Sequence, residues 1–342
     1  MVTPHFTSIR QAILEALDEA TEEILVAVYW FTNVQLFSAL CNKVKAGKKV
    51  SVIVHNDYIN NREAGLDFQS FIDLGGQFYF SSSEYPMHNK FCVIDNKILI
   101  NGSYNWTYFA ETKNSENVLI IRNEDEAISA FRGEFLQLAQ HLKQESRVRR
   151  LTTFELDEFN GLSARDYLAN DIVFEAQATN RPEIVDAAFK LAPRNLDVQR
   201  VAVQLDLTKK RKLTCSIGVG LKDNKYLVGV EKGTVLPVTI SRIVQTSVDN
   251  QETCGSTLYY GNASRASTNK EMGKIEVTRL PKKPAGQAKL KFVFTIDIYG
   301  ELLVQCYSLD NGRRDTFTVS LNGILTTVPP SELVSNSNSQ PE

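Results

Sequence analysis

The segment HNKFCVIDNKILINGSYN, residues 88–105, organises our interpretation of the whole chain. It places an imidazole, an ammonium group and several amide and hydroxyl donors in one short run. His88 and Lys90 stand two apart at the start of an apolar stretch, and residues two apart in a strand project from the same face. An imidazole can attack phosphorus, and a neighbouring ammonium can neutralise phosphodiester oxygens. The segment therefore predicts a phosphoryl-transfer site that needs no metal.

A bare His-x-Lys pair occurs often by chance, but here a longer pattern follows it. Asp95 comes after four further residues, Gly102-Ser103 after six more, and Asn105 two positions beyond Ser103. This spacing resembles the HKD signature, His-x-Lys-x4-Asp-x6-Gly-Ser-x-Asn, of the phospholipase D superfamily. The resemblance extends from about residue 5 to residue 142.

The resemblance implies a role for each matching residue. It makes His88 the nucleophile, and it assigns Lys90, Ser103 and Asn105 to the phosphate oxygens. The attack of His88 on phosphorus is expected to give a phosphohistidine intermediate. No metal ion and no cofactor is implied.

Three further residues take supporting roles. The stretch Asn114-Ser115-Glu116-Asn117 resembles one in the small nuclease branch whose Glu orients the nucleophilic His, which gives that role to Glu116. Gly102 completes the Gly-Ser pair. Asp95 matches the signature, but Asp-Asn pairs favour tight turns. We therefore expect Asp95 to serve the turn Asp95-Asn96-Lys97 more than the chemistry.

The superfamily builds one active site from two such motifs, and this chain carries one. Among its four His, His5 and His55 lack a Lys two residues on. His141-Leu142-Lys143 matches the first three positions, but Val148 stands where the Asp belongs. A chain with one motif needs a second copy of itself, so we expect a twofold homodimer in which the same patch faces itself.

Length and charge constrain the partners. At 342 residues the chain is long enough for about two domains. Lys and Arg number 38 against 40 Asp and Glu, so net charge alone does not indicate nucleic acid. Two basic clusters, within residues 43–49 and 143–150, can track a phosphate backbone or form solvated faces.

Cysteine usage and hydropathy indicate the compartment. The five Cys form no C-x-x-C pair and no metal-ligand spacing with the His residues, which argues against zinc and against a disulfide framework. The apolar run from Ile24 to Phe31 is far too short to span a membrane. We expect a soluble cytoplasmic protein with no membrane segment.

Hydrophobic periodicity predicts alternating helices and strands up to residue 150. Apolar residues recur at helical spacing in residues 7–20, 34–45, 62–74 and 124–142. Strands are predicted at residues 23–31, 50–55, 77–81 and 117–122, with a further strand starting at His88. The near-continuous apolar run at 23–31 fits a strand that is covered on both faces. Residues 1–150 are therefore expected to form a layered α/β domain of the phospholipase D type.

The chain changes character after residue 150. Helical periodicity and the positions of Pro182 and Pro193 predict a short helical connector over residues 151–198. Short alternating strands follow, the first at residues 201–207, and they predict an all-β unit. Its segments at 217–218, 233–237 and 294–297, among others, resemble the β-sandwich substrate-binding domain of the seventy-kilodalton heat-shock chaperones over residues 199–322.

The sandwich departs from those chaperones in its pocket. Lys222, Cys254 and Ser256 stand where the chaperones place apolar groups, and burial of an aliphatic side chain supplies about 1.5–3 kcal/mol. No ATPase domain or helical lid accompanies the sandwich, so ATP-driven cycling is not implied. We expect residues 199–323 to recruit a protein or peptide partner or to serve dimerisation, and residues 324–342 to be a disordered tail.

The features together indicate a hydrolase, a metal-independent phosphodiesterase that acts as a nuclease, most simply an endonuclease, at a site shared by two chains. Two alternatives remain open. One is a phospholipid-hydrolysing phospholipase D, and the other is a non-catalytic binding protein on the same scaffold. A phosphatidyl substrate demands an apolar landing surface, and the sequence shows no basic amphipathic helix that would provide one. Nucleic acid is therefore the expected substrate.

Overall fold

The computed structural model describes residues 1–82, 87–151, 158–159 and 162–328. Its contacts divide the chain into two compact units, Met1–Ala192 and Pro193–Glu342. Each unit has a hydrophobic core of its own. Within the described residues, no helix combines the length and the apolar character needed to cross a membrane.

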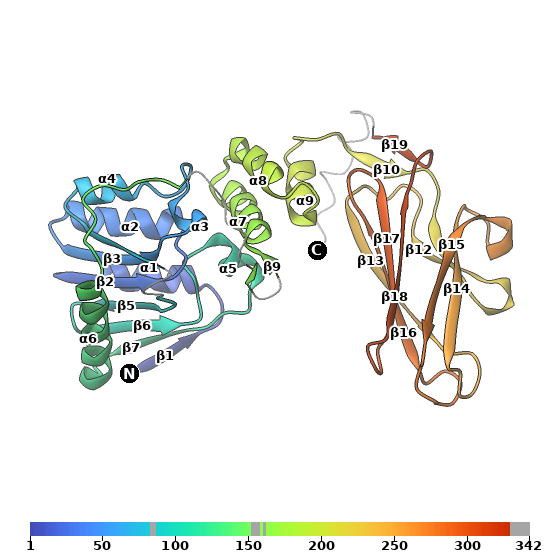
Figure 1. The fold of residues 1–342 in the computed structure, drawn as a ribbon, viewed down its shortest axis with the longest axis horizontal. Coiled ribbons are helices and arrows are strands. Elements are labelled where there is room, and N and C mark those ends of the chain that lie inside the picture. The colour runs from blue at the N-terminus through green and yellow to red at the C-terminus, as the bar shows by residue number, and fades with distance from the viewer. Residues whose placement is uncertain (83–86, 152–157, 160–161, 329–342) are drawn as a thin grey trace, which may run out of the picture. The chain divides into compact units, whose positions relative to one another are not determined.

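The first unit is built on a seven-stranded mixed sheet with the order β1-β7-β6-β5-β2-β3-β4 (Figure 1). The strands are β1 (Val2–His5), β2 (Glu23–Val28), β3 (Lys49–His55), β4 (Gln77–Ser81), β5 (Lys90–Ile94), β6 (Ile98–Gly102) and β7 (Val118–Arg122). The strands β2, β3 and β4 run parallel, as their helical connections require. The remaining neighbours pair antiparallel.

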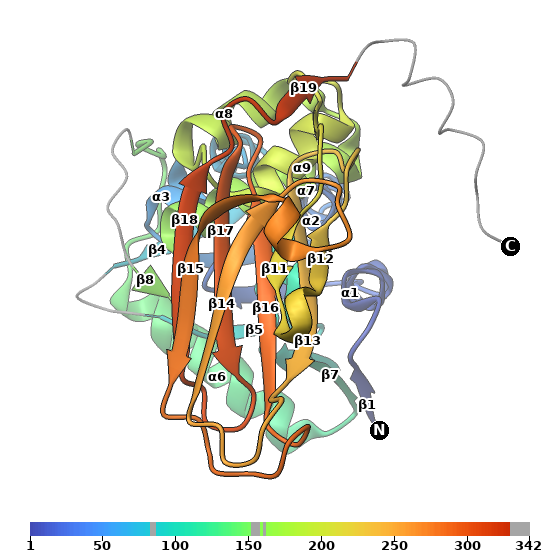
Figure 2. The ribbon, with the colours of Figure 1, turned by 90° about the vertical axis from the view of Figure 1, so that its right-hand side faces the viewer.

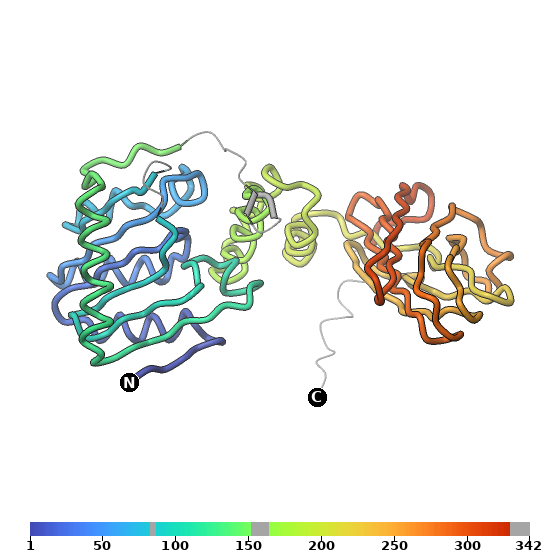
Figure 3. Tube along the Cα trace, turned by 60° about the horizontal axis from the view of Figure 1, so that its bottom comes forward, coloured from blue at the N-terminus to red at the C-terminus, as the bar shows by residue number. Residues whose placement is uncertain are grey.

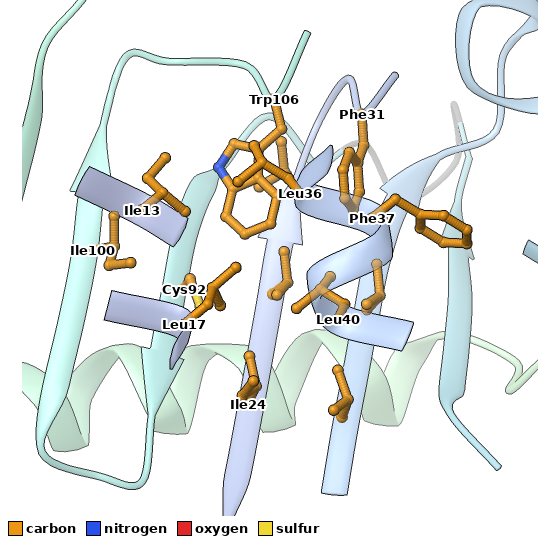
Figure 4. Close-up of a cluster of buried hydrophobic side chains, with 14 of the residues drawn as sticks. Ile13, Leu17, Ile24, Phe31, Leu36, Phe37, Leu40, Cys92, Ile100 and Trp106 are labelled. Atoms are coloured by element: carbon orange, nitrogen blue, oxygen red, sulfur yellow. The ribbon is translucent and has the colours of Figure 1, made fainter. Parts of the chain in front are cut away.

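Helices cover both faces of this sheet, which confirms the layered α/β architecture. Helices α1 (Ile9–Asp18) and α2 (Val34–Lys45) pack on one face, where Leu17 and Leu40 lie over Ile24 of β2 (Figure 4). Helix α6 (Asp125–His141) lies across the other face (Figure 3), where Phe135 packs against Leu25 and Ala27 of the same strand. Strand β2 is therefore apolar on both faces, as its uninterrupted apolar run predicted.

The helix expected at residues 62–74 is shorter in the structure, because only helix α4 (Phe68–Asp73) forms within that range and a separate short helix, α3 (Tyr58–Asn61), precedes it. Helix α3 begins at Asp57, whose Oδ1 accepts from Asn60 N at 3.0 Å. Helix α4 begins at Asp67, whose Oδ1 accepts from Ser70 N at 3.1 Å. Two capping aspartates therefore start two separate helices.

The expected connector at residues 151–198 is not a separate element. Helix α7 (Ala164–Thr179) and helix α8 (Val185–Leu191) belong to the first unit, and α7 is buried along most of its length. Asp171 of α7 accepts from Phe109 N at 2.8 Å, at the start of helix α5 (Tyr108–Lys113). The polar side chains of this segment made it resemble a solvent-facing linker. In the structure several of them, Asp171 among them, are buried.

A buried charge pair reinforces this attachment. Burial raises the pKa of Asp171 and lowers the pKa of Arg62, while each charge favours the ionised form of the other. Arg62 lies just after α3 in the chain and Asp171 lies on α7. The two opposite charges therefore attract each other between α7 and the segment after α3, although burial outweighs that attraction in both pKa values.

The second unit confirms the all-β sandwich, preceded by a helix. Its two four-stranded antiparallel sheets have the orders β12-β11-β14-β15 and β13-β16-β17-β18 (Figure 2). The strands are β11 (Ile217–Gly220), β12 (Tyr226–Val230), β13 (Val238–Gln245), β14 (Thr253–Tyr260), β15 (Lys270–Thr278), β16 (Lys289–Ile296), β17 (Glu301–Ser308) and β18 (Arg314–Ser320). Their inward side chains form one core between the sheets.

Two sequence predictions at the borders of this unit are wrong. Residues 201–207 are not a strand, because helix α9 (Leu196–Gln204) occupies most of them. Asn195 caps this helix, and Val198, Val201 and Ala202 bury one helical face. The tail also begins later than residue 324, because β19 (Leu325–Thr327) pairs with β10 (Arg211–Leu213). Residues 329–342 lie outside the described part of the chain.

The placement of α7 predicts where the chain can be shortened. A chain ending at Ala192 should unfold in one cooperative transition, whereas a chain ending at Arg150 should be insoluble or lose that transition. The shorter chain exposes Phe109 and the surrounding surface of α5, and each large side chain that loses its cover costs about 1.5–3 kcal/mol. Thermal unfolding followed by circular dichroism compares the two, and equal midpoints would contradict the assignment of α7.

Candidate active site

The candidate residues meet at one edge of the first unit's sheet. Strands β2 and β3 end there, β5 begins there, β6 ends there at Gly102, and β7 begins there after Glu116. The antiparallel pairing of β5 with β2 brings the start of one beside the end of the other. His88 lies just before β5 instead of inside a strand, and its side chain is exposed.

His88 and Lys90 do lie side by side, as their spacing predicted. Lys90 Nζ donates to the backbone oxygen of His88 at 2.8 Å. The same nitrogen lies 3.4 Å from Nε2 and 3.5 Å from Nδ1 of the imidazole. One phosphate group placed at this edge can therefore reach both side chains.

The environment tunes the charge of both groups. Burial lowers the pKa of His88, and the charges of Lys90 and His55 lower it further. Burial also lowers the pKa of Lys90 to about 8, although the charge of Glu116 opposes that shift. A neutral imidazole carries the lone pair that a nucleophile needs. At neutral pH the site therefore favours an uncharged His88 beside a charged Lys90.

Gly102 and Ser103 connect the motif to the start of β7. A Cβ on Gly102 would lie 2.1 Å from the backbone oxygen of Asn117, so this position requires glycine. Ser103 N donates to that oxygen at 3.1 Å, and Asn117 N donates to Ser103 Oγ at 3.1 Å. The Ser103 hydroxyl donates to Glu116. The motif serine is thereby held at the same edge as His88.

Glu116 interacts with both Ser103 and Lys90. Its Oε2 accepts from Ser103 and its Oε1 accepts from Asn114 Nδ2 at 2.8 Å. Its charge acts on Lys90. The structure therefore brings Glu116 into the site, where its hydrogen bonds to Ser103 and Asn114 fix the carboxylate.

Asn105 is buried and its orientation is fixed. Its Oδ1 accepts from Trp30 N at 3.2 Å, and Trp106 N donates to Trp30 O at 3.0 Å. The loop after β6 is thereby tied to the end of β2. Asn105 is thus positioned by backbone contacts from the parallel half of the sheet.

Asp95 lies at the opposite end of β5 from the site, as expected for a turn residue. Asp95 and Asn96 both have positive φ, at 51° and 52°. The Asp95 carboxylate also accepts from the backbone nitrogens of Thr21, Glu22 and Glu23 at 2.6–2.8 Å. The sequence did not predict these hydrogen bonds. Asp95 therefore fastens the start of β2 to the β5–β6 turn and plays no direct part at the catalytic edge.

Helix α7 supports the site from behind, which the sequence did not predict. The Tyr167 hydroxyl lies 2.7 Å from Thr107 Oγ1. The centroid of the Tyr167 ring lies 4.4 Å from that of Trp30 and 4.3 Å from that of Phe109. Trp30 is the residue whose backbone holds Asn105. Only a long-range contact map could have found Tyr167, because sixty residues separate it from Thr107.

Each of the two basic clusters has a cation that contacts the fold. Lys43 Nζ donates to the backbone oxygens of Asp18 and Ala20. Arg150 donates to Leu66 O at 2.8 Å and lies 3.9 Å from Asp67. In each cluster, at least one cation therefore contacts other groups of the first unit.

The comparisons with known proteins agree with this geometry. A family model described as "Cardiolipin synthase, PLD-like domain" matches residues 13–139. The mitochondrial cardiolipin hydrolase of Chlamydomonas reinhardtii is 31% identical over 125 residues, which cover 36% of this chain and 55% of that protein. The human mitochondrial cardiolipin hydrolase is 34% identical over 134 residues, covering 39% and 51%. The chain thus spans about half the length of the curated relatives that its first unit matches.

A solved structure titled as a phospholipase D family member, Nuc from Salmonella typhimurium, is also similar. It is 26% identical, with a TM-score of 0.40, and the match covers 43% of this chain and 99% of Nuc.

The second unit has different relatives. A family model described as "Hsp70 protein" matches residues 204–341. The chaperone protein DnaK of Halobacterium salinarum is 29% identical over 104 residues, which cover 30% of this chain and 16% of that protein. Residues 13–139 therefore form a phospholipase D-like domain, joined in one chain to a region related to the Hsp70 chaperones.

Proposed function

We propose that the first unit is a metal-independent phosphodiesterase that cleaves nucleic acid through a phosphohistidine intermediate. The observation that carries this proposal is the contact of the Lys90 ammonium with the His88 ring, at the sheet edge that also holds Ser103 and Asn105. A nucleophile, a cation and neutral donors from separate segments are what in-line attack on a phosphodiester requires.

The proposed reaction has two steps. An imidazole nitrogen of His88 attacks phosphorus, the P–N bond forms, and the bond to the leaving oxygen breaks. Lys90, Ser103 and Asn105 hold the non-bridging oxygens, and the leaving oxygen takes a proton from a second His88. That second His88 then removes a proton from water, which attacks phosphorus and releases the first His88. Glu116 orients the imidazole in this scheme.

The second His88 is proposed to come from another copy of this chain. The described part of the chain places one HKD motif in the first unit, and the exposed side chains of His88 and Ser103 leave the site open at the sheet edge. A twofold axis through that edge would set two His88 residues on opposite sides of one phosphate. The site is therefore proposed to be complete only in the homodimer.

Lipid hydrolysis is the second candidate, because the named relatives of the first unit are cardiolipin hydrolases. Membrane-bound phosphodiesters call for an apolar landing surface. Among described residues of the first unit, large exposed apolar side chains lie in the first six residues, at the end of α4 and on α6: Met1, Val2, Phe6, Leu74 and Leu136. These side chains do not form the apolar face of an amphipathic helix, and this favours nucleic acid. A non-catalytic binding role is disfavoured because every motif residue is present.

The sandwich is proposed to recruit a target or partner. A cavity of about 640 Å³ opens between the loops around residues 220–227 and 243–256. Lys222, Cys254 and Ser256 all line it, as the sequence comparison with the chaperones implied. Its apolar lining includes Leu227 and Ile243. The mixed lining favours a polar or charged segment over the aliphatic peptides that chaperone pockets hold.

The chemistry predicts cleavage in excess chelator. Purified protein is incubated in EDTA with labelled single-stranded and duplex DNA and RNA, beside a phosphatidylcholine reporter. We expect cleavage of a nucleic acid to persist, and His88→Ala to reduce it at least about 10³-fold because the nucleophile is lost. His141→Ala, a histidine outside the motif, is the matched control.

Three outcomes would contradict this chemistry. Activity that is lost in EDTA and restored by magnesium would indicate that a metal-activated water, and not His88, attacks phosphorus. Turnover of the lipid reporter alone would favour the second candidate. A His88→Ala chain with unchanged activity would remove the nucleophile from the mechanism.

The pKa values predict a pH window for kcat/KM. The active form needs a neutral attacking His88, a protonated second His88 and a charged Lys90, so kcat/KM should have an acidic and an alkaline limb. The two His88 groups set the acidic limb and the start of the alkaline limb, both below the ordinary imidazole range, because the pKa of His88 is lowered. Above pH about 8, where Lys90 loses its proton, kcat/KM should fall more steeply. Lys90→Arg should lower activity but remove that steeper fall, since a guanidinium stays charged. A steeper fall above pH about 8 that persists in that variant would contradict the assignment.

A further inference from the structure

A second imidazole stands one aromatic ring away from His88. His55 ends β3, and its ring stacks on Tyr29 with the centroids 4.8 Å apart and the planes inclined by 19°. The Tyr29 ring in turn contacts His88, at 4.6 Å between centroids. Ser81, at the end of β4, lies with its Oγ 3.3 Å from His55 Nδ1. Four neighbouring strand ends thus present a continuous row of polar and aromatic side chains.

The backbone holds this row in place. His55 N donates to Tyr29 O at 3.2 Å. The buried Asn60 side chain donates from Nδ2 to the backbone oxygens of both Tyr29 and His55, at 2.8 Å each. Helix α3, which carries Asn60, is itself capped by Asp57, which also accepts from Trp30 Nε1 at 2.6 Å. The position of His55 is therefore set by the same contacts that position the end of β2.

Two features separate His55 from an ordinary packing residue. The side chain is half-buried, so it meets both the fold and the solvent at the catalytic edge. Its charge also acts on two neighbours, because it adds to the burial that lowers the pKa of His88 and it opposes the burial that raises the pKa of Asp57. A side chain that only filled space beside Tyr29 would need neither hydrogen-bonding nitrogens nor charge.

The intervening ring determines what His55 can reach. A phosphate in contact with His88 and Lys90 is separated from His55 by Tyr29, so His55 is badly placed for the leaving oxygen of that same phosphodiester. In a nucleic-acid strand, the next phosphate follows one nucleoside further along, on the side of β3 and β4. The half-buried His55 imidazole is a suitable donor to its oxygens at that place, while the buried Ser81 hydroxyl contacts the imidazole and not the phosphate.

We propose that His55, supported by Tyr29 and Ser81, forms a second phosphate-binding subsite for the phosphodiester adjacent to the scissile one in a single nucleic-acid strand. The inference rests on the proposed function, and it specifies the substrate as a strand with at least two neighbouring phosphodiesters. His55 binds the substrate, Tyr29 sets the spacing between the two phosphates, and Ser81 fixes the imidazole.

Binding to the His88→Ala chain tests this subsite without any need for turnover. Fluorescence anisotropy measures the Kd of a labelled thymidine hexanucleotide, and competition measures that of a dinucleotide with one phosphodiester. His55→Phe keeps an aromatic ring on Tyr29 but removes the donors. We expect it to weaken hexanucleotide binding about tenfold, to affect the dinucleotide at least fivefold less, and to reduce the salt slope by about one.

Companion variants keep the result interpretable. His55→Lys should restore most of the hexanucleotide affinity, because an ammonium also binds phosphate. His141→Phe is the matched control for loss of an exposed histidine. His55→Gln, measured in parallel, replaces His55→Phe if the latter has a lowered thermal midpoint.

Equal losses on both oligonucleotides, or no loss on either, would overturn the subsite. Vesicles containing cardiolipin, which has two phosphodiesters, and vesicles containing phosphatidylglycerol, which has one, form the lipid arm. A His55→Phe defect confined to cardiolipin would move the subsite to a lipid headgroup and overturn the nucleic-acid assignment. If wild type cleaves no substrate while the hexanucleotide defect persists, the proposed function fails and the subsite stands.

Discussion

The contact between the Lys90 ammonium and the ring and carbonyl of His88 is the interaction on which the proposed chemistry of the first unit depends. Partial burial lowers the pKa of both groups and leaves a neutral imidazole next to a cation at neutral pH. Neither group could hold this state in a flexible loop, because the balance rests on their separation and their cover. The surrounding fold holds the two side chains at this separation.

Two parts of the fold position the side chains. The mixed sheet brings the ends of β2 and β6 beside the start of β5, and the backbone of Trp30 then fixes Asn105. Helix α7 packs Tyr167 against Trp30 from outside the region matched by the phospholipase D-like model. Residues beyond 139 therefore stabilise the sheet edge that holds the candidate site, and the first unit extends to Ala192.

Local patterns predicted much of this arrangement. The motif spacing identified the residues gathered at the edge, and the apolar run of β2 predicted its burial on both faces. Long-range features were not predictable from the sequence. Asp171 looked like a solvated residue but is buried against α5 and opposite Arg62. Val201 was predicted to start a strand, but it lies in helix α9, which Asn195 caps from outside the predicted strand. The role of His55 depends on which strand ends become neighbours.

The proposed mechanism needs His88 from two chains at one site. The most direct measurement mixes wild-type chains with His88→Ala chains, allows the subunits to exchange, and records activity per wild-type chain. With random pairing and inactive mixed dimers, that activity falls to about half at equal amounts and to about a quarter at threefold excess of the variant. Activity per wild-type chain that stays constant as the variant is added would contradict the shared site.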